Sequence, residues 1–329
     1  MLNIVAPYFL HNFMVPGKQK RSQSNKMYFT SLPDHSKAGF DETRHFDKFG
    51  KHNIIFHAES NESHCDDHVG CLSIKTVWSG EEIYGVDGRQ LVVRPGQLLV
   101  LNNDQRYSCR IRSRENVQCF SIFFKNDFAS SVLTDTLHTE AFLLDNPDRD
   151  GSEIPEFYQT LRQITPDIDR QFSGLKGLLQ MGEYHQAGVD EHLIFMLRNL
   201  IGIYRSDIKS IGLVKAVKAS TRREIYRRLC IARDLLHSSL GESLDLNTVG
   251  TQAGLSVPQL VRQFKSVFQT TPHQYLTDIR LKQAAGLLQH TDQQVQDVAW
   301  ACGFENAGAF SRAFRSVYGV QPTRFRLEN

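Results

Sequence analysis

The pattern of apolar and polar positions divides the chain into regions with different periods. Between about residues 52 and 125, apolar and polar residues alternate in short runs such as CLSIKTVW, RQLVVR and VQCFSIFF. Turn-forming pairs, among them Asp87-Gly88 and Pro95-Gly96, separate the runs. Alternation with period two is typical of strands that bury one face. We therefore predict six or more short strands in an antiparallel double sheet or small barrel, with a hairpin at Asp87-Gly88.

The period changes toward 3.6 residues after about residue 126, and the segment 173–204 predicts two amphipathic helices. The apolar residues at steps of three and four are Leu175, Leu178, Leu179, Leu193, Ile194, Leu197, Leu200, Ile201 and Tyr204. This stripe either packs on the β region or pairs with the same stripe of a second copy, and we favour the homodimer. Weaker periodicity over 206–222 indicates the interdomain connection.

The last third of the chain repeats itself. The stretches LSVPQLVRQFKSVFQTTPHQY, at 255–275, and GFENAGAFSRAFRSVYGVQPTRF, at 303–325, align at an offset of 50 positions. The residues of the first copy that have a counterpart are Leu260, Phe264, Phe268, Pro272 and Tyr275, and the counterparts are Phe310, Phe314, Tyr318, Pro322 and Phe325. We therefore predict two structural units of the same kind.

Each copy has the layout of a helix-turn-helix: a short helix, a glycine, and a second helix with a polar, basic outer face. Gly254 and Gly303 mark the two turns, and Ser256 is a candidate N-cap for the helix that follows the first turn. The residues expected in the two cores are Leu246, Val249, Ala253, Leu260, Phe264, Val267 and Phe268, then Val295, Val298, Ala299, Phe310, Phe314 and Val317. In the first unit Gln259, Arg262, Gln263 and Ser266 are expected on the outer face.

One predicted helix, over 272–289, separates the two units. Such a helix spans about 27 Å at 1.5 Å per residue, against about 34 Å for one turn of B-DNA. An α-helix fits the major groove of B-DNA. The spacing therefore predicts two recognition helices held in successive major grooves on one side of a duplex.

Residues 224–328 resemble the DNA-binding domain of the AraC/XylS family of transcription regulators. The match is carried by Gly303-Phe304, the run FSRAFR at 310–315, Tyr318-Gly319-Val320 and Pro322, and by Gly254, Leu260, Arg262, Phe264-Lys265 and Thr271-Pro272 in the first copy. The resemblance implies seven helices and base reading mainly by the second helix of each unit. Carried onto this chain, the base-reading positions are Pro258, Gln259, Val261, Arg262 and Ser266, and then Asn306, Ala307, Gly308, Ser311 and Arg312.

The second unit has few side chains that could contact bases, because Ala307-Gly308-Ala309 offers almost no side chain to a base edge. We therefore expect the first unit to carry more of the specificity, through Arg262 and Gln259. Arg312 either reads a base or instead braces the domain or holds a phosphate. The other phosphate candidates, for which a solvated helix face is the alternative, are Lys265, Lys282, Arg315 and Arg324.

Charge adds modest support for a polyanionic partner. The net charge of the whole chain is +2, but residues 221–329 hold 13 Lys and Arg against 9 Asp and Glu. The resemblance implies double-stranded operator or promoter DNA as the partner, with RNA polymerase as a second partner and activation as the outcome. Sequence alone identifies neither the operator nor the target genes.

The β region resembles, more loosely, the cupin-like sensing domain often fused to this DNA-binding domain. The match rests on Pro95-Gly96, the strand after it, and Asn103-Asp104. Arg106-Tyr107 occupies the place of a metal-binding histidine of enzymatic cupins, and HAESNESHCDDH reads as a polar loop, although His64 and His68 share a face if that stretch is helical. We therefore expect no metal and no cofactor, but a pocket for an unknown small-molecule effector. Its candidate lining residues are Trp78, Tyr84, Tyr107 and Phe123.

The resulting prediction is an α+β chain with no enzymatic activity. We expect an irregular segment 1–50, a cupin-like sensing domain 51–205 with its helical pair, the connection 206–222 and an all-α DNA-binding domain 223–329. A metal-dependent cupin enzyme on a DNA-binding tail is the alternative. The six cysteines contain no Cys-x-x-Cys pair, which fits a reduced cytoplasm and speaks against a repair methyltransferase with a cysteine metal site. We see no signal peptide and no membrane anchor.

Overall fold

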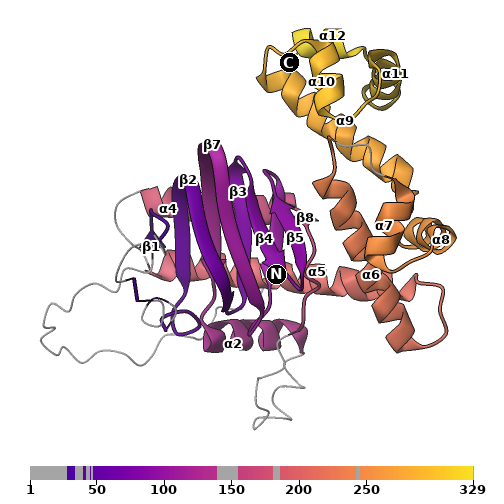
Figure 1. Cartoon of the computed structure of the whole chain (residues 1–329). Coiled ribbons are helices and arrows are strands. Elements are labelled where there is room, and N and C mark those ends of the chain that lie inside the picture. Colours follow the sequence, from indigo (N-terminus) through magenta and orange to yellow (C-terminus); the bar gives the residue numbers. More distant parts are fainter. Residues whose placement is uncertain are drawn as a thin grey trace, which may run out of the picture.

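The computed structural model describes residues 28–33, 40–41, 45, 47–138, 155–180, 186–241 and 245–328. A β domain is followed by a helical domain that extends to one side of it (Figure 1). This arrangement confirms the predicted α+β fold class. Most of the predicted irregular segment 1–50 lies outside the described residues, but β1 (Tyr28–Phe29) pairs in parallel with the strand β2.

The strands of the β domain form one sheet in the order β1-β2-β7-β3-β6-β8, and β4 pairs with β5 and β7. The bounds are β2 (Ile54–Val69), β3 (Ser73–Ser79), β4 (Glu82–Val86), β5 (Arg89–Val93), β6 (Gln97–Leu101), β7 (Arg106–Phe123) and β8 (Arg162–Gln163). Because β7 pairs with β2, β3 and β4, the sheet curls on itself. Asp87 and Gly88, at φ 50° and 72°, form the predicted hairpin turn between β4 and β5.

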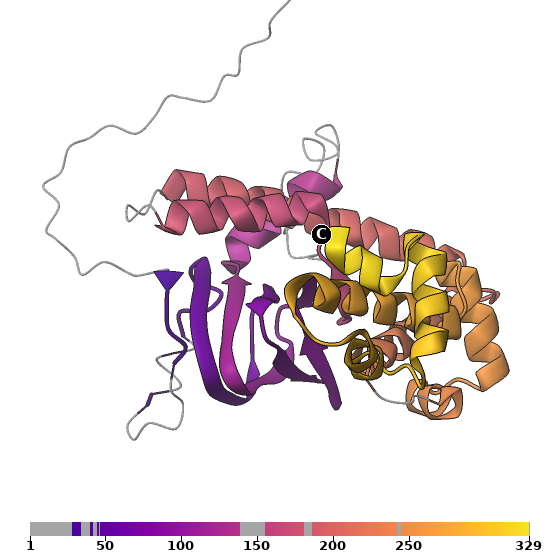
Figure 2. The same ribbon diagram turned by 90° about the horizontal axis from the view of Figure 1, so that it is seen from above.

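The two faces of the sheet bury different clusters, as period two requires. On one face lie α2 (Asn126–Leu137), α4 (Pro166–Gln180) and α5 (Gln186–Gly212), with α4 and α5 side by side (Figure 2). The helix residues fully buried against the sheet include Leu175, Leu193, Met196, Leu197, Leu200 and Ile201. Most of the stripe that we assigned to dimerisation therefore packs inside the protein.

The stretch HAESNESHCDDH is a strand and not the predicted loop. It lies within β2, which pairs with β7 and has register shifts between Ser60 and Glu62 and between Cys65 and His68. Its polarity is explained by exposure, because only Ala58 and Cys65 in this stretch are buried among residues whose burial is described.

The helical domain contains the seven helices that the family resemblance implied, within residues 219–241 and 245–328. They are α6 (Ala219–Ser238), α7 (Leu246–Ala253), α8 (Val257–Phe268), α9 (Pro272–His290), α10 (Val295–Ala301), α11 (Ala307–Tyr318) and α12 (Pro322–Glu328). Two separate apolar clusters fill it, one for each helix-turn-helix unit. The helix α9 contributes Leu276 to the first cluster and Leu281 and Leu288 to the second.

The connection between the domains is shorter than the predicted segment 206–222. The helix α5 continues to Gly212 and α6 begins at Ala219, so that residues 213–218 join them. The apolar periodicity is weak over the end of α5 because a polar residue occupies a buried position there. Asp207 is buried because it pairs with other polar groups, and Ile211 joins the core of the first helix-turn-helix unit.

Candidate nucleic-acid interface

Both turns need glycine. Gly254 and Gly303 have φ of 68° and 74°, in the left-handed region that side chains disfavour. At Gly303 a Cβ atom would also lie 2.5 Å from the carbonyl oxygen of Leu240, and that contact is too close. The two glycines therefore fix the angle at which α8 and α11 leave their preceding helices.

The helix α8 presents a mixed outer face. Leu260, Phe264 and Val267 are buried, as predicted. Among the predicted base-reading residues, Pro258 and Arg262 are exposed and Gln259 and Val261 are partly exposed. Ser256 occupies the N-cap position, although its side chain makes no capping hydrogen bond. Gln259 and Arg262 are therefore the long polar side chains of the predicted set on the outer face of α8.

One side of α8 is taken up by the interdomain connection. Gln263, which we expected on the outer face, is 1% exposed and bonds both backbone groups of Lys215. The Ser266 hydroxyl donates to the carbonyl of Leu213 over 2.8 Å. Helical spacing shows which residues share a face of a helix but not what packs against that face. The sequence therefore could not show that Gln263 and Ser266 contact the interdomain connection.

The helix α11 carries the other five predicted base-reading residues on its N-terminal two turns. Asn306 is the N-cap, and its Oδ1 accepts from the backbone N–H of Ala309 over 2.7 Å. Gly308 and Arg312 are exposed, and Ala307 and Ser311 are partly exposed. With the Asn306 side chain engaged in the cap, Arg312 is the longest polar side chain of the predicted set on this helix.

We predicted that Val317 belongs to the buried stripe of α11, and this prediction is wrong. The residue is 56% exposed. Its counterpart Val267 is buried because Ile211 and Val214, from the end of α5 and the connection, cover the first unit. The second unit does not belong to that cluster. The two copies therefore have similar sequences but different surroundings.

The predicted phosphate contacts come from four helices. Lys265, Lys282, Arg315 and Arg324 are all exposed, on α8, α9, α11 and α12. Figure 1 shows α8 and α11 at the side of the helical domain away from the β sheet, near opposite ends of α9. The 19 residues of α9 make it about 28 Å long at 1.5 Å per residue. A capping box between Thr271 and Gln274 fixes its start.

The comparisons with known proteins agree with this geometry. A family model described as a helix-turn-helix domain matches residues 249–328. The transcriptional activator RhaS of Enterobacter sp. strain 638 is 37% identical over 91 residues, which are 28% of this chain and 33% of the relative. RhaS of Escherichia fergusonii is 34% identical over 187 residues, 49% of this chain and 66% of the relative.

The C-terminal domain is an AraC-type DNA-binding domain. The alignments with these two activators span between a third and about two thirds of their length. Among solved structures, an AraC-type regulator from Chromobacterium violaceum is 29% identical, with 34% of this chain and 96% of that chain covered and a TM-score of 0.30. ToxT from Vibrio cholerae, with bound unsaturated fatty acid, is 14% identical, with 83% and 94% covered and a TM-score of 0.33.

Three of the four residues predicted to line an effector pocket lie around one cavity inside the curled sheet of the β domain. Tyr84, Tyr107 and Phe123 line a cavity of about 60 Å³. Trp78 lies on the opposite face, with its ring 4.7 Å from that of Phe120, because residues one apart on a strand point to opposite faces. The cavity is small beside the roughly 300–1,000 Å³ of ordinary ligand pockets.

Two charged residues that sequence analysis missed also line this cavity. Lys75 is 2% exposed and Glu82 5% exposed. Burial lowers the pKa of Lys75 to about 8 and raises the pKa of Glu82. Within the described residues, no group of three His, Cys, Asp or Glu side chains is placed to hold a metal ion. The histidines His64 and His68 lie on a strand, so the helical face that we considered for them does not exist.

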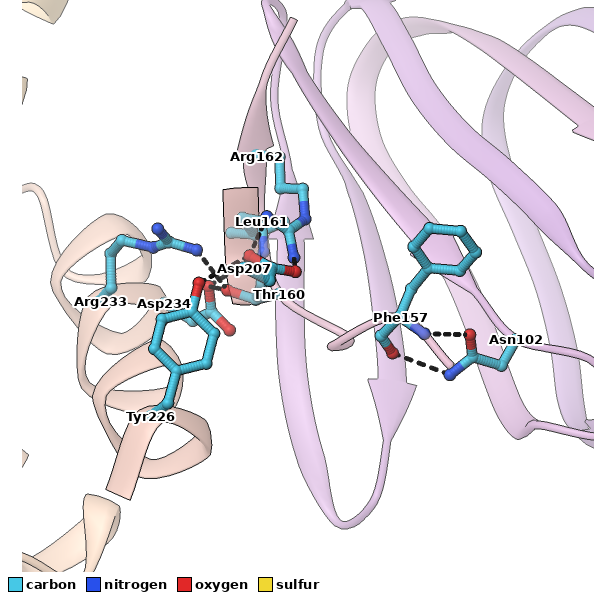
Figure 3. Close-up of polar contacts among 9 residues, drawn as sticks. All are labelled: Asn102, Phe157, Thr160, Leu161, Arg162, Asp207, Tyr226, Arg233 and Asp234. Carbon is cyan, nitrogen blue, oxygen red and sulfur yellow. Dashed lines mark hydrogen bonds and ion pairs between the residues drawn. The ribbon is translucent and has the colours of Figure 1, made fainter. Parts of the chain in front are cut away.

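Buried polar contacts join the AraC-type domain to the β domain through the segment 155–163 (Figure 3). Asn102 holds this segment to the sheet, with its side chain exchanging two hydrogen bonds with the backbone of Phe157. Asp234 of α6 accepts from the Thr160 hydroxyl over 2.6 Å and from the Leu161 N–H over 3.0 Å.

A second carboxylate, Asp207 of α5, completes the junction. It pairs with Arg162 and accepts from the Tyr226 hydroxyl of α6 over 2.6 Å. Close by, His237 of α6 has Gln97 Nε2 3.2 Å from its Nδ1 and Tyr275 Oη 2.8 Å from its Nε2. Burial is the main cause that raises the pKa of Asp234 to about 6 and lowers that of His237 to about 4. Sequence analysis did not single out Asp207, Asp234 or His237, because isolated polar positions in helices usually face solvent.

Proposed function

We propose that the protein is a sequence-specific transcription activator whose β domain controls the AraC-type domain. The duplicated helix-turn-helix carries this proposal, because α8 and α11 lie near opposite ends of α9. The length of α9, about 28 Å, is close to one turn of B-DNA, about 34 Å. Curated relatives of this domain are named transcriptional activators. Activation implies RNA polymerase as a partner, and we place the protein in the cytoplasm, on DNA.

Selection of bound sites from a random duplex library with the full-length protein tests this function. We expect two short boxes about one helical turn apart, the stronger one read by α8. A weak second box follows from the small side chains at Ala307 and Gly308. Failure to enrich any motif at both low and moderate salt would contradict sequence-specific reading.

We further propose that the protein forms a homodimer through the outer face of α4 and α5. The inner stripe packs on the sheet, but Phe195 on α5 is 41% exposed. Asp167, Arg170, Glu191 and Arg198 lie in the same hollow, and their mixed charges suit a symmetric contact. Sedimentation should give a dimer for the wild type and a monomer for Phe195→Asp. The same mass for both would contradict this interface.

Control by a small-molecule effector is supported by the buried junction of Asp207, Asp234 and His237. These contacts join the β domain, including its helix α5, to α6 of the AraC-type domain. An effector changes DNA binding only if it binds two arrangements of this junction unequally. No observation favours the metal-dependent cupin enzyme. Among the described residues, no helix is both long and apolar enough to cross a membrane.

A further inference from the structure

Two cysteines lie opposite each other inside the curled sheet of the β domain. Cys65 of β2 and Cys109 of β7 are Cα partners in the antiparallel ladder, and both line the cavity of about 60 Å³. Opposite residues of an antiparallel pair have Cα atoms about 4.5–5.5 Å apart, and a disulfide spans about 4.4–6.8 Å. No other two cysteines of the described chain are partners in a strand ladder. The ladder therefore already holds Cys65 and Cys109 at a separation that a disulfide can bridge.

A bulge in β2 brings a histidine to the same cavity. On a regular strand, residues three apart point to opposite faces of the sheet. Here the three-residue step from Cys65 to His68 lies opposite the two-residue step from Cys109 to Tyr107, so β2 contains one extra residue. As a result all four side chains line the cavity, and Cys65 Sγ lies 3.3 Å from His68 Nδ1. The thiol proton of Cys65 therefore has a base beside it.

The two thiols have different surroundings. The pKa of Cys109 is raised well above its ordinary value, first by a hydrogen bond with Cys65 and then by burial. Cys109 therefore keeps its proton and donates it to the sulfur of Cys65. Because the thiolate is the reactive form of cysteine, Cys65, with His68 beside it, is the sulfur that reacts first.

The cavity has room for a small oxidant and little else. Its volume of about 60 Å³ exceeds the roughly 10–15 Å³ that one water molecule needs, but is far below the roughly 300–1,000 Å³ of ligand pockets. Hydrogen peroxide fits this space, whereas a peptide disulfide such as oxidised glutathione does not. Ser63 and His68 line the cavity and are partly exposed, so its edge reaches solvent.

We propose that Cys65 and Cys109 form a reversible disulfide, with hydrogen peroxide as the oxidant. His68 takes the proton of Cys65, whose sulfur attacks one peroxide oxygen. An S–O bond forms, the O–O bond breaks, and the leaving hydroxide takes the proton from His68 and departs as water. The Cys109 sulfur then attacks the sulfenic acid of Cys65, and the hydroxyl group leaves with the Cys109 proton as a second water. The two thiols lose two electrons, and the peroxide gains them.

The pair is connected to the AraC-type domain through neighbouring strands. Cys109 is the partner of Tyr84 on β4, and β4 pairs with β5. Arg89 of β5 forms an ion pair with Asp234 of α6 over 3.4 Å. A change of strand geometry at the disulfide can therefore reach the junction of Figure 3. Any effect on DNA rests on the proposed function, whereas the disulfide itself does not.

Peptide mapping of the full-length protein under non-reducing conditions tests the disulfide. After submillimolar hydrogen peroxide we expect one linkage within the chain, between Cys65 and Cys109, and its loss after dithiothreitol. The control Cys71→Ala removes a buried cysteine that lies outside the cavity and should leave the linkage in place. His68→Gln should slow the formation of the linkage by about tenfold or more, because it removes the base beside Cys65.

Trapping with dimedone, which reacts with sulfenic acids, tests the order of the two steps. In Cys109→Ser the sulfenic acid of Cys65 has no thiol to attack it and should be trapped. In Cys65→Ser we expect no trapping at Cys109. Equal trapping at both positions would show that the two roles are assigned wrongly.

The disulfide is overturned by any of three results of the mapping. They are a linkage of Cys65 or Cys109 to another cysteine such as Cys119, a linkage between two chains, and two thiols that stay free at a peroxide dose that oxidises free cysteine in solution. The wild type alone decides among these results, so the conclusion does not depend on the folding of any variant.

A separate measurement isolates the consequence for DNA. The affinity for a selected duplex is measured with the reduced and the oxidised wild type and with Cys109→Ser after the same treatments. Regulation requires that oxidation changes the affinity of the wild type but not that of Cys109→Ser, and an unchanged wild type rules regulation out. A protein that forms the disulfide but binds no duplex in either state instead contradicts the proposed function and leaves the disulfide standing.

Discussion

At the scale of single residues, the junction between the domains pairs two buried groups whose titrations oppose each other. Asp234 has its pKa raised to about 6, so the folded state binds its proton more readily than the unfolded state does. Its contribution to stability is present at low pH and is lost as the pH rises through 6. His237 has its pKa lowered to about 4, so its contribution is lost as the pH falls from 6.5 through 4.

Replacing Asp234 with Asn should therefore make the protein sensitive to acid. Asn keeps an acceptor for Thr160 but removes the titration that offsets His237. We expect the free energy of unfolding of Asp234→Asn to fall by about 2–3 kcal/mol more than that of the wild type between pH 7 and pH 4. Urea denaturation across this range measures the difference. The control His237→Gln should change in the opposite direction, and parallel pH profiles for all three proteins would contradict the assignment.

Two neighbouring side chains of α8 distinguish base reading from phosphate binding. Arg262→Ala should weaken binding to the selected duplex by about 1–3 kcal/mol and relax the preference at one base pair. Lys265→Ala should weaken binding to all sequences alike and make the salt dependence shallower. Affinities over a panel of single-base variants at several salt concentrations measure both effects. The role assignment is wrong if the two variants have the same profile.

At the scale of elements, the turn before α11 and the turn after it each contain a glycine, and the two form a matched pair. Gly303 and Gly319 have nearly the same φ, 74° and 78°. A Cβ at Gly303 meets the Leu240 carbonyl, whereas a Cβ at Gly319 meets no described atom within 4 Å. Gly319→Ala should cost about 1–2 kcal/mol, the left-handed penalty alone. Gly303→Ala should cost about 2–5 kcal/mol, because crowding adds to the same penalty.

Chemical denaturation of both variants measures these costs, with DNA affinity as the second readout. Gly303→Ala should also weaken DNA binding, because the clash tilts α10 against α11. Equal stability of the two variants would show that the close approach to Leu240 does not constrain this turn.

Elements with local signals could be predicted from sequence, whereas their surroundings could not. The glycine turns, the α9 spacer and the Asp87-Gly88 hairpin each follow from residues within a few positions of one another. The strand nature of HAESNESHCDDH depends on pairing with β7, some 50 residues away. Val317 and Gln263 were misplaced for the same kind of reason, because the connection between the domains covers only one of the two similar units.

At the scale of the whole molecule, buried polar contacts and apolar contacts jointly hold the domains together. Asp207, Asp234 and His237 are each less than 5% exposed, and each has a partner across the junction. Removing one partner of a buried ion pair destabilises a protein, because the remaining charged group stays in a low-dielectric interior without a partner. The junction therefore has a defined geometry, and it is expected to separate as a unit when a central residue is removed.

Asp207→Ala should separate the unfolding of the two domains. The change leaves Arg162 and the Tyr226 hydroxyl without their acceptor and should cost about 3–5 kcal/mol, the usual loss for breaking a buried pair. Since that cost falls on the junction, calorimetry should show two transitions where the wild type shows one. The control Asp169→Ala removes an exposed carboxylate from α4, outside the proposed dimer contact, and should change stability by less than about 1 kcal/mol. A single transition in Asp207→Ala, with the midpoint of the wild type, would mean that this polar junction does not couple the domains.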